Sequence, residues 1–263
     1  MKKSKRVAVI SDPHCGHRVG LTPPKYDSKP KDPKELKWYY ARRALYVQYN
    51  RMVKANKPID ILLCLGDGLD GRGERSGSLE LLTTDRTKQC EMYADVINTW
   101  EAKHIVLVFG TAYHTGQKED WESIVADKVN ADKIGGQEWV DVNGVIFDLK
   151  HFTGMTQVPG NTTTLAREWV WNLIWNIRDE QPKADIFLRG HVHNFSYVGN
   201  DSFLAVTCPV LQGLGSKFGA RIPSRRIDFG ILHFTIPGKH GEKFTWDWDI
   251  VTVAEQKPEV LSF

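Results

Sequence analysis

Aspartate and histidine side chains recur directly after short apolar runs of this sequence. The runs are VAVIS, LLCLG, VLVFG, VIFDLK and IFLRG, and each precedes at least one side chain that can bind a metal ion. Aspartate and histidine together, without cysteine thiolates, suit Mn, Fe or Zn better than Mg or Ca. In chain order the candidate residues are Asp12 and His14, Asp67, Thr111 and His114, His151, and His191 and His193.

Each of these motifs is weak by itself, because Asp-x-His and Gly-Asp are common and a buried histidine is often held by a backbone carbonyl. Their recurrence in order, each after an apolar run, points instead to one shared site. The candidates outnumber the ligands that one ion uses. Two divalent ions bridged by a carboxylate would use them well, and such pairs, about 3.5–4 Å apart, clamp a phosphoryl group and activate a water.

The elements that must position these residues follow from local patterns. Strands are predicted over 6–11, 59–65, 104–109, 145–150, 185–188, 202–207, 229–236 and 244–251, with a hairpin turn at Asn143-Gly144. Helices are predicted over 33–54, 86–102, 119–129 and 163–179, with Asp32 and Asp85 as the N-caps of the first two.

The order of these elements predicts an α/β fold. Strands alternate with helices in the early part, which favours parallel pairing, whereas hairpin-like strands dominate the later part. The carboxyl ends of parallel strands share one edge of a sheet, and α/β proteins place ligand-binding loops there. Candidate ligands that lie far apart in the sequence are therefore expected to converge at that edge.

Composition sets the broad class of the protein. The chain has 263 residues, a formal charge of +3 and 41% hydrophobic residues, which are ordinary values for a soluble globular protein. No linker or repeat is evident, so a single domain over 1–263 is expected. No apolar run reaches the length of about 18 residues that a membrane span needs. Four cysteines without a CxxC motif predict reduced thiols and a cytoplasmic protein.

The ordered set of motifs resembles the calcineurin-like metallophosphoesterase superfamily. The set is Asp12-x-His14, Gly66-Asp67, Gly110 to His114, His151 and Gly190-His191-x-His193. The resemblance implies a four-layer αββα sandwich with two mixed β-sheets and a centre of two metal ions, with Mn expected first and Fe or Zn as alternatives. It also implies that Asp12, His14 and His193 bind one ion, that Asp67 bridges, and that His151 and His191 bind the other. A hydroxide between the ions would attack phosphorus.

One motif departs from the family pattern. The family usually has Gly-Asn-His, whereas this chain reads Gly110-Thr111-Ala112-Tyr113-His114. Thr111 could replace the asparagine as a weak oxygen ligand while His114 acts as the general acid. Alternatively His114 could itself bind the metal, or the segment could have lost metal contact. The G-T-x-x-H pattern is similar to that of phage-type relatives of the superfamily's recombination nucleases, and we expect His114 at the site as ligand or acid.

Charge is distributed unevenly along the chain. Residues 1–60 carry a net charge of +10 and the remainder carries −7. Several cations of residues 18–54 either face a polyanion such as DNA or belong to a solvated loop and helix face; they are Lys25, Lys29, Lys31, Arg42 and Arg43. Arg72 and Arg75 follow Asp67 closely and are candidate contacts to a substrate phosphate.

These residues predict a metal-dependent phosphoesterase. The basic region and the G-T-x-x-H variant favour hydrolysis of a phosphodiester, with nucleic acid or a nucleotide as the candidate substrate. A small-molecule phosphomonoesterase is the first alternative, because no accessory DNA-binding domain is evident. A catalytically decayed interaction module of the same fold is the second, and the missing asparagine is the evidence for it. The substrate and the oligomeric state are not determined by the sequence.

Overall fold

The computed structural model describes residues 2–74, 77–115, 119–154, 161–214, 226–239 and 241–254. The helices are η1 (Pro24–Tyr26), α1 (Pro33–Asn56), α2 (Arg86–Asn98), α3 (Ala112–Thr115), α4 (Trp121–Lys128) and α5 (Asn161–Ile177). The strands are β1 (Lys5–Ile10), β2 (Ile61–Cys64), β3 (His104–Val108), β4 (Lys133–Gly135), β5 (Gln137–Val142), β6 (Val145–Lys150), β7 (Ile186–Arg189), β8 (Ser196–Gly199), β9 (Leu204–Thr207), β10 (Arg226–Ile236) and β11 (Thr245–Ala254).

The strands form two mixed sheets. The first has the order β11-β10-β1-β2-β3-β4, in which β1 to β4 pair in parallel and β10 is antiparallel to both of its neighbours. The second has the order β5-β6-β7-β9-β8, in which β6, β7 and β9 are parallel and each edge strand is antiparallel. The expected combination of parallel and hairpin pairing is thus confirmed in both sheets.

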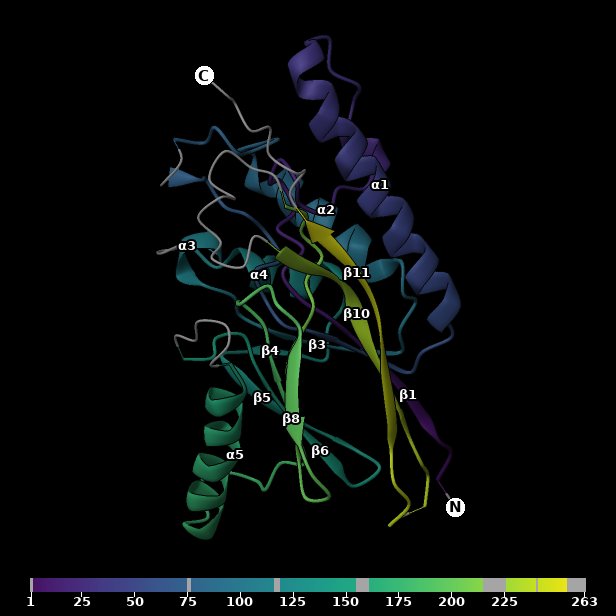
Figure 1. Cartoon of the computed structure of the whole chain (residues 1–263), viewed down its shortest axis with the longest axis vertical. Helices are drawn as coiled ribbons and strands as arrows, with labels where there is room; N and C mark the ends of the chain where they lie inside the picture. Colours follow the sequence, from purple (N-terminus) through teal and green to yellow (C-terminus); the bar gives the residue numbers. More distant parts are fainter. Residues whose placement is uncertain are drawn as a thin grey trace, which may run out of the picture.

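The two sheets pack face to face and helices cover their outer faces (Figure 1). Apolar side chains of β1, β2, β3 and β10 meet those of β6, β7 and β9 in the central core. A second core lies between the first sheet and α1, α2 and α4, and a third lies between the second sheet and α5. The molecule is therefore the four-layer αββα sandwich that the motifs led us to expect.

Local capping explains where three of the helices begin. The side chains of Asp32, Asp85 and Asp120 accept hydrogen bonds from the backbone N–H of Lys34, Lys88 and Ser123. Each bond satisfies an amide that the first helical turn leaves without a partner. The N-caps Asp32 and Asp85 are confirmed, because the two helices begin at Pro33 and Arg86.

The structure also contains short elements that the sequence pattern did not predict. β4 has three residues, and β8 and α3 have four each, which is too short for a recognisable period. All four cysteines are buried and free. Within the described part of the chain, no helix is long and apolar enough to cross a membrane.

Candidate metal centre

The structure brings candidate ligands from separate strand ends together at one edge of the sandwich. Asp12, His14 and His193 place one ligand atom each within 4.8 Å of one another. Asp67, His151 and His191 form a second such group. These are the two sets that the family resemblance implied for two ions, and they come from loops after β1, β2, β6 and β7.

Polar atoms of these groups face one another at short distances. Nε2 of His193 lies 3.3 Å from Nε2 of His14 and also 3.3 Å from Oδ1 of Asp12. Nε2 of His151 lies 3.1 Å from Oδ2 of Asp67. Among the described residues, Oδ1 of Asp12 and Nε2 of His151 are buried and lack a hydrogen bond. Because an unpaired buried polar atom is costly, converging atoms of this kind fit divalent cations.

Backbone strain is concentrated at the same residues. Five of the six candidate ligands have left-handed φ angles between 44° and 72°: Asp12, His14, Asp67, His191 and His193. Residues other than glycine rarely adopt this conformation, and such strain persists at functional sites, where the surrounding structure enforces it. The strained loops turn the ligands back toward the sheet edge.

Hydrogen bonds fix the orientation of the imidazole and carboxylate groups. Nδ1 of His151 lies 2.5 Å from the carbonyl oxygen of Leu65, which leaves Nε2 directed toward Asp67. Oδ2 of Asp12 accepts from the backbone N–H of His191 at 3.2 Å and from the hydroxyl of Ser11. Partners of this kind set the tautomer and direction of metal ligands.

Electrostatics keep the acids of the site charged. Burial alone would raise the pKa of Asp12, but the charge of His151 and the nearby imidazole of His193 lower it to about 2. Burial likewise opposes ionisation of Asp67, but the charges of His151, His114 and His14 together outweigh it, so this pKa also lies well below the usual range. Burial would lower the pKa of His151, whereas Asp12 and Asp67 raise it to about 10. Without a metal, protons on histidine thus balance the two carboxylates.

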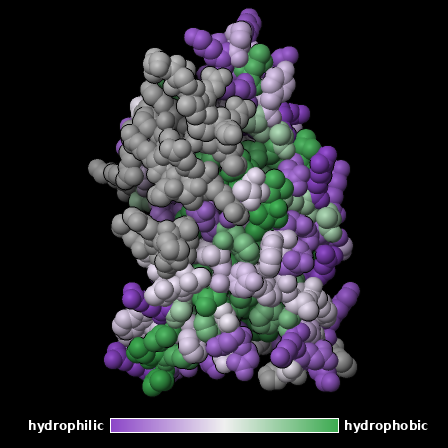
Figure 2. All heavy atoms as spheres, viewed as in Figure 1, coloured by the Kyte–Doolittle hydropathy of each residue, from purple (hydrophilic) through white to green (hydrophobic). Residues whose placement is uncertain are grey.

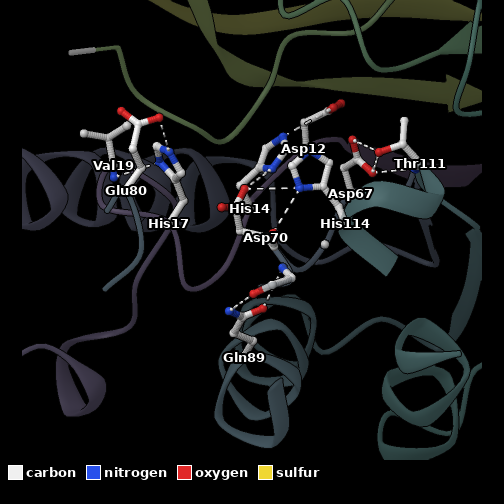
Figure 3. Close-up of polar contacts among 12 residues, drawn as sticks. Asp12, His14, His17, Val19, Asp67, Asp70, Glu80, Gln89, Thr111 and His114 are labelled. Carbon is white, nitrogen blue, oxygen red and sulfur yellow. Dashed lines mark hydrogen bonds and ion pairs between the residues drawn. The ribbon is translucent and has the colours of Figure 1, made fainter. Parts of the chain in front are cut away.

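His114 also lies at the site, as expected. It forms a third group with His14 and Asp67, again with ligand atoms within 4.8 Å. Its Nδ1 lies 3.2 Å from the backbone oxygen of Asp70 and 3.3 Å from the Asp70 carboxylate (Figure 3). Burial would lower the pKa of His114, but the hydrogen bond to Asp70 and the charge of Asp67 raise it to about 9.

Asp70 is a buried site residue that the sequence analysis did not identify. Its Oδ1 lies 2.9 Å from Nδ1 of His14, so one carboxylate orients both His14 and His114. Burial opposes its ionisation, but the charge of His17 and the hydrogen bonds to His114 and His14 lower its pKa well below the usual range. The only signal in the sequence is a second aspartate three residues after Asp67.

Thr111 forms hydrogen bonds to the carboxylate of Asp67. Its backbone N–H donates to Oδ1 of Asp67 at 2.6 Å, and its hydroxyl lies 3.1 Å from the same oxygen. The hydroxyl of Thr111 thus has Asp67 as its partner. Of the three alternatives, this geometry favours the two that place His114 at the centre, as the acid or as a ligand.

Glu122 connects the loop that follows β2 to the loop that follows β3. Its Oε1 accepts from the backbone N–H of Gly68 at 2.9 Å, and its Oε2 accepts from that of Gly110 at 2.7 Å. Burial raises the pKa of Glu122 to about 7, against the effect of these two hydrogen bonds. Gln89 clamps the next turn in the same way, through the backbone N–H and oxygen of Gly71.

Other residues with expected roles fall outside this centre. Figure 3 shows His17 turned toward Glu80 and Val19, away from His14 and Asp70. The guanidinium of Arg72 is exposed and lies 3.9 Å from Glu119. Arg75 lies outside the described residues.

Comparison with known proteins gives matches among solved structures alone. No protein-family model and no curated protein matches the chain. A Vps29 variant from Entamoeba histolytica aligns with a TM-score of 0.45 and 16% identity, over 94% of this chain and 99% of that one. A novel archaeal phosphodiesterase aligns with a TM-score of 0.46 and 11% identity, over 94% and 99%. At these values the likeness says nothing about activity.

The sheet order, the four layers and the ligand groups at one edge decide the architecture. The chain is an α/β sandwich of two mixed sheets with candidate ligand groups at one edge, which is the architecture that the resemblance to calcineurin-like metallophosphoesterases implied. Within this fold the candidate centre occupies the loops that follow parallel strands in both sheets. The arrangement can hold divalent cations between acids and imidazoles, and it places a protonated histidine beside them.

Proposed function

We propose that this protein is a metal-dependent phosphodiesterase. The observation that carries the proposal is the pair of ligand groups, Asp12/His14/His193 and Asp67/His151/His191, in which Oδ1 of Asp12 and Nε2 of His151 are buried without a hydrogen bond among the described residues. When bound there, divalent ions such as Mn²⁺ would lower the pKa of a water and neutralise charge on the phosphoryl oxygens. The site also has a proton donor, and hydrolysis of an ester needs both functions.

His114 is the residue that we assign to the leaving group. Asp70 lies beside its Nδ1, so its Nε2 is the nitrogen left for the substrate. The same carboxylate stabilises the protonated form of the imidazole. Proton transfer from such a group to a departing oxygen contributes about 10²–10⁴ in rate.

The charge around the centre supports a diester over a monoester. A phosphodiester carries one negative charge, whereas a monoester carries nearly two at neutral pH. The exposed Arg72 is the described cation closest in sequence to Asp67, and Glu119 already lies beside it. Within the described residues no lysine or arginine pairs with Asp12 or Asp67, so positive charge at the centre would come from the metals and the histidines alone, which favours the less charged ester.

Metal loading followed by a substrate screen tests the proposal. We expect Mn²⁺-loaded protein to bind at least one ion per chain and to hydrolyse bis(p-nitrophenyl) phosphate faster than p-nitrophenyl phosphate. His191→Ala should reduce diester hydrolysis to background. Faster monoester hydrolysis would favour the phosphomonoesterase. Less than one ion per chain after loading would favour a decayed interaction module.

Leaving-group dependence tests the role of His114. We expect His114→Ala to slow hydrolysis of a diester with an alcohol leaving group by about 10²–10⁴. Hydrolysis of bis(p-nitrophenyl) phosphate should fall much less, because p-nitrophenolate departs without a proton. An equal loss on both substrates would show that His114 acts as a ligand instead.

A further inference from the structure

Helix α1 and the segment before it present a group of exposed cations on the side of the sandwich where β1 ends, because α1 connects the parallel strands β1 and β2. Four lysines, Lys29, Lys31, Lys34 and Lys37, are all exposed, and we call them the lysine cluster. In Figure 1 the N-terminal end of α1 stands above the body of the molecule, and in Figure 2 the side chains at this end are hydrophilic. No ion pair joins these four lysines to an acid of the described chain.

The acids nearest in sequence to the lysine cluster are engaged elsewhere. The buried Asp27 forms a bidentate pair with Arg42, at 2.8 and 3.0 Å. Asp32 caps α1 through the backbone N–H of Lys34, and Glu35 lies 3.6 Å from Arg18. Positive charge on this surface is therefore not neutralised from within.

This corrects part of the expectation for the basic region. Arg42 is buried in its pair with Asp27, and Lys25 lies 2.7 Å from Asp95. Neither cation is available to a polyanion without breaking an ion pair. Lys29 and Lys31 remain available, and Lys34 and Lys37 join them on the exposed side of the first helical turns.

The lysine cluster is anchored to the loop that carries His14. Nη1 of Arg42 donates to the carbonyl oxygen of Arg18 at 2.8 Å, and Arg18 is four residues beyond His14. The guanidinium of Arg18 lies 5.9 Å from the ring centre of Trp38, and the ammonium of Lys37 lies 4.5 Å from the same ring. The contacts of Arg42 and Trp38 with Arg18 pack α1 against the segment that follows His14, so a long substrate that extends from the centre along this segment would reach the cations of α1.

We propose that the lysine cluster binds the phosphate backbone of a nucleic acid whose scissile phosphodiester lies at the metal centre. The inference rests on the proposed function and names its substrate class. Exposed lysines form contacts to phosphate that do not depend on base sequence. Each neutralised phosphate releases counterions, so binding must weaken as salt concentration rises.

Steady-state kinetics with a triple variant tests this inference. Lys31→Gln/Lys34→Gln/Lys37→Gln is compared with Lys128→Gln/Lys183→Gln/Lys243→Gln, which removes the same charge from three exposed lysines elsewhere. We expect the first variant alone to raise KM for a 30-residue DNA strand or duplex. The slope of log KM against log salt should fall by about 2–3. Both variants should hydrolyse bis(p-nitrophenyl) phosphate as the unmodified protein does.

Binding without metal separates this inference from the proposed function. In EDTA, a fluorescent DNA strand or duplex should bind the unmodified protein in a salt-dependent way, and the lysine-cluster variant should bind it more weakly than the control variant. Equal binding by both variants would overturn the inference and leave diester hydrolysis untouched. Binding to phosphatidylserine vesicles but not to DNA would also overturn it. Loss of diester hydrolysis with intact DNA binding would instead refute the catalytic proposal.

Discussion

Two buried charged clusters lie on β6, β7 and the loops that follow them, and they differ in how completely they are paired. One surrounds Arg189 on the side of the second sheet that faces α5. The other is the candidate metal centre, which takes His151 and His191 from the ends of the same strands. Asp148 and His151 are three residues apart, and Arg189 and His191 are two apart.

The Arg189 cluster contains its own counter-charges. The guanidinium is fully buried, and its two terminal nitrogens donate to the Asp148 carboxylate, to Glu168 and to two backbone oxygens. Burial would lower the pKa of Arg189, but the charges of Asp148 and Glu168 raise it. Within the described residues only its Nε lacks a partner. Such a cluster needs no ligand.

The candidate metal centre contains carboxylates and imidazoles. When the histidines are neutral, the carboxylate oxygens and imidazole nitrogens that face one another are potential hydrogen-bond acceptors without donors. It also holds the strained backbone angles, whereas Asp148, Glu168 and Arg189 do not appear among the residues with positive φ. Buried charge is therefore a sign of a binding site only where its partners are incomplete. Four expected effects test this contrast.

Breaking the Arg189 cluster should have the largest effect on stability. We expect Arg189→Met to lower the free energy of unfolding by about 3–5 kcal/mol, because Asp148 would remain buried without its counter-charge. His191→Gln replaces a candidate ligand with a side chain of similar size. It should change the free energy of unfolding of the metal-free protein by less than about 1 kcal/mol. Urea denaturation in EDTA measures both. Equal losses would mean that the two clusters have the same structural role.

Metal should stabilise only the incompletely paired cluster. At a Mn²⁺ concentration 100 times the dissociation constant, we expect the free energy of unfolding to rise by about 2.7 kcal/mol. For a chain of this size the melting temperature should rise by roughly 5–10 °C. The Arg189→Met variant should keep this increase, and His151→Ala should lose it. An unchanged increase in His151→Ala would place the metal elsewhere on the protein.

The positions of the longer elements could be predicted from the sequence because their signals are local. The apolar runs before Asp12, Asp67 and His151 form strands, and Asp32 and Asp85 cap helices. Family motifs supplied the ligand sets that the structure brings together.

The supporting residues could not be predicted in the same way because they act across long sequence separations. Asp70 meets His14 from 56 residues away, and Glu122 reaches Gly68 across 54. A single aspartate or glutamate in a polar loop or helix has no pattern that reveals such a partner. The pairing of Arg42 with Asp27 was missed for the same reason, since a cation on a helix is more often solvated.

Glu122 is intermediate between the fully paired Arg189 cluster and the incompletely paired candidate metal centre. Within the described residues, its buried carboxylate accepts hydrogen bonds from backbone amides only. We expect Glu122→Gln to lower the free energy of unfolding by about 1–2 kcal/mol, since the amide NH₂ would face the N–H of Gly68 or Gly110. Exposed Glu91→Gln is the matched control and should change it by less than about 0.5 kcal/mol. If Glu122→Gln left the free energy of unfolding unchanged, water would satisfy the amides of Gly68 and Gly110.

The last expected effect is a pH dependence that bound metal should oppose. Burial lowers the pKa values of His114 and His151, but neighbouring acids raise them to about 9 and about 10. Groups with a raised pKa stabilise the fold fully below about 6.5, and this contribution is lost as pH rises through those values. Metal-free protein should therefore lose up to about 1.4 kcal/mol per group for each pH unit above neutrality.

Bound metal should oppose this trend, because it requires the ligand histidines to be neutral and so binds more tightly as pH rises. At a fixed, sub-saturating Mn²⁺ concentration, the stabilisation by metal should increase between pH 6 and pH 8. Urea denaturation with Mn²⁺ or EDTA at each pH measures the two slopes. In EDTA, His151→Ala should flatten the decline, whereas Arg189→Met should leave its slope unchanged. Parallel slopes with and without Mn²⁺ would show that His114 and His151 do not exchange protons for metal.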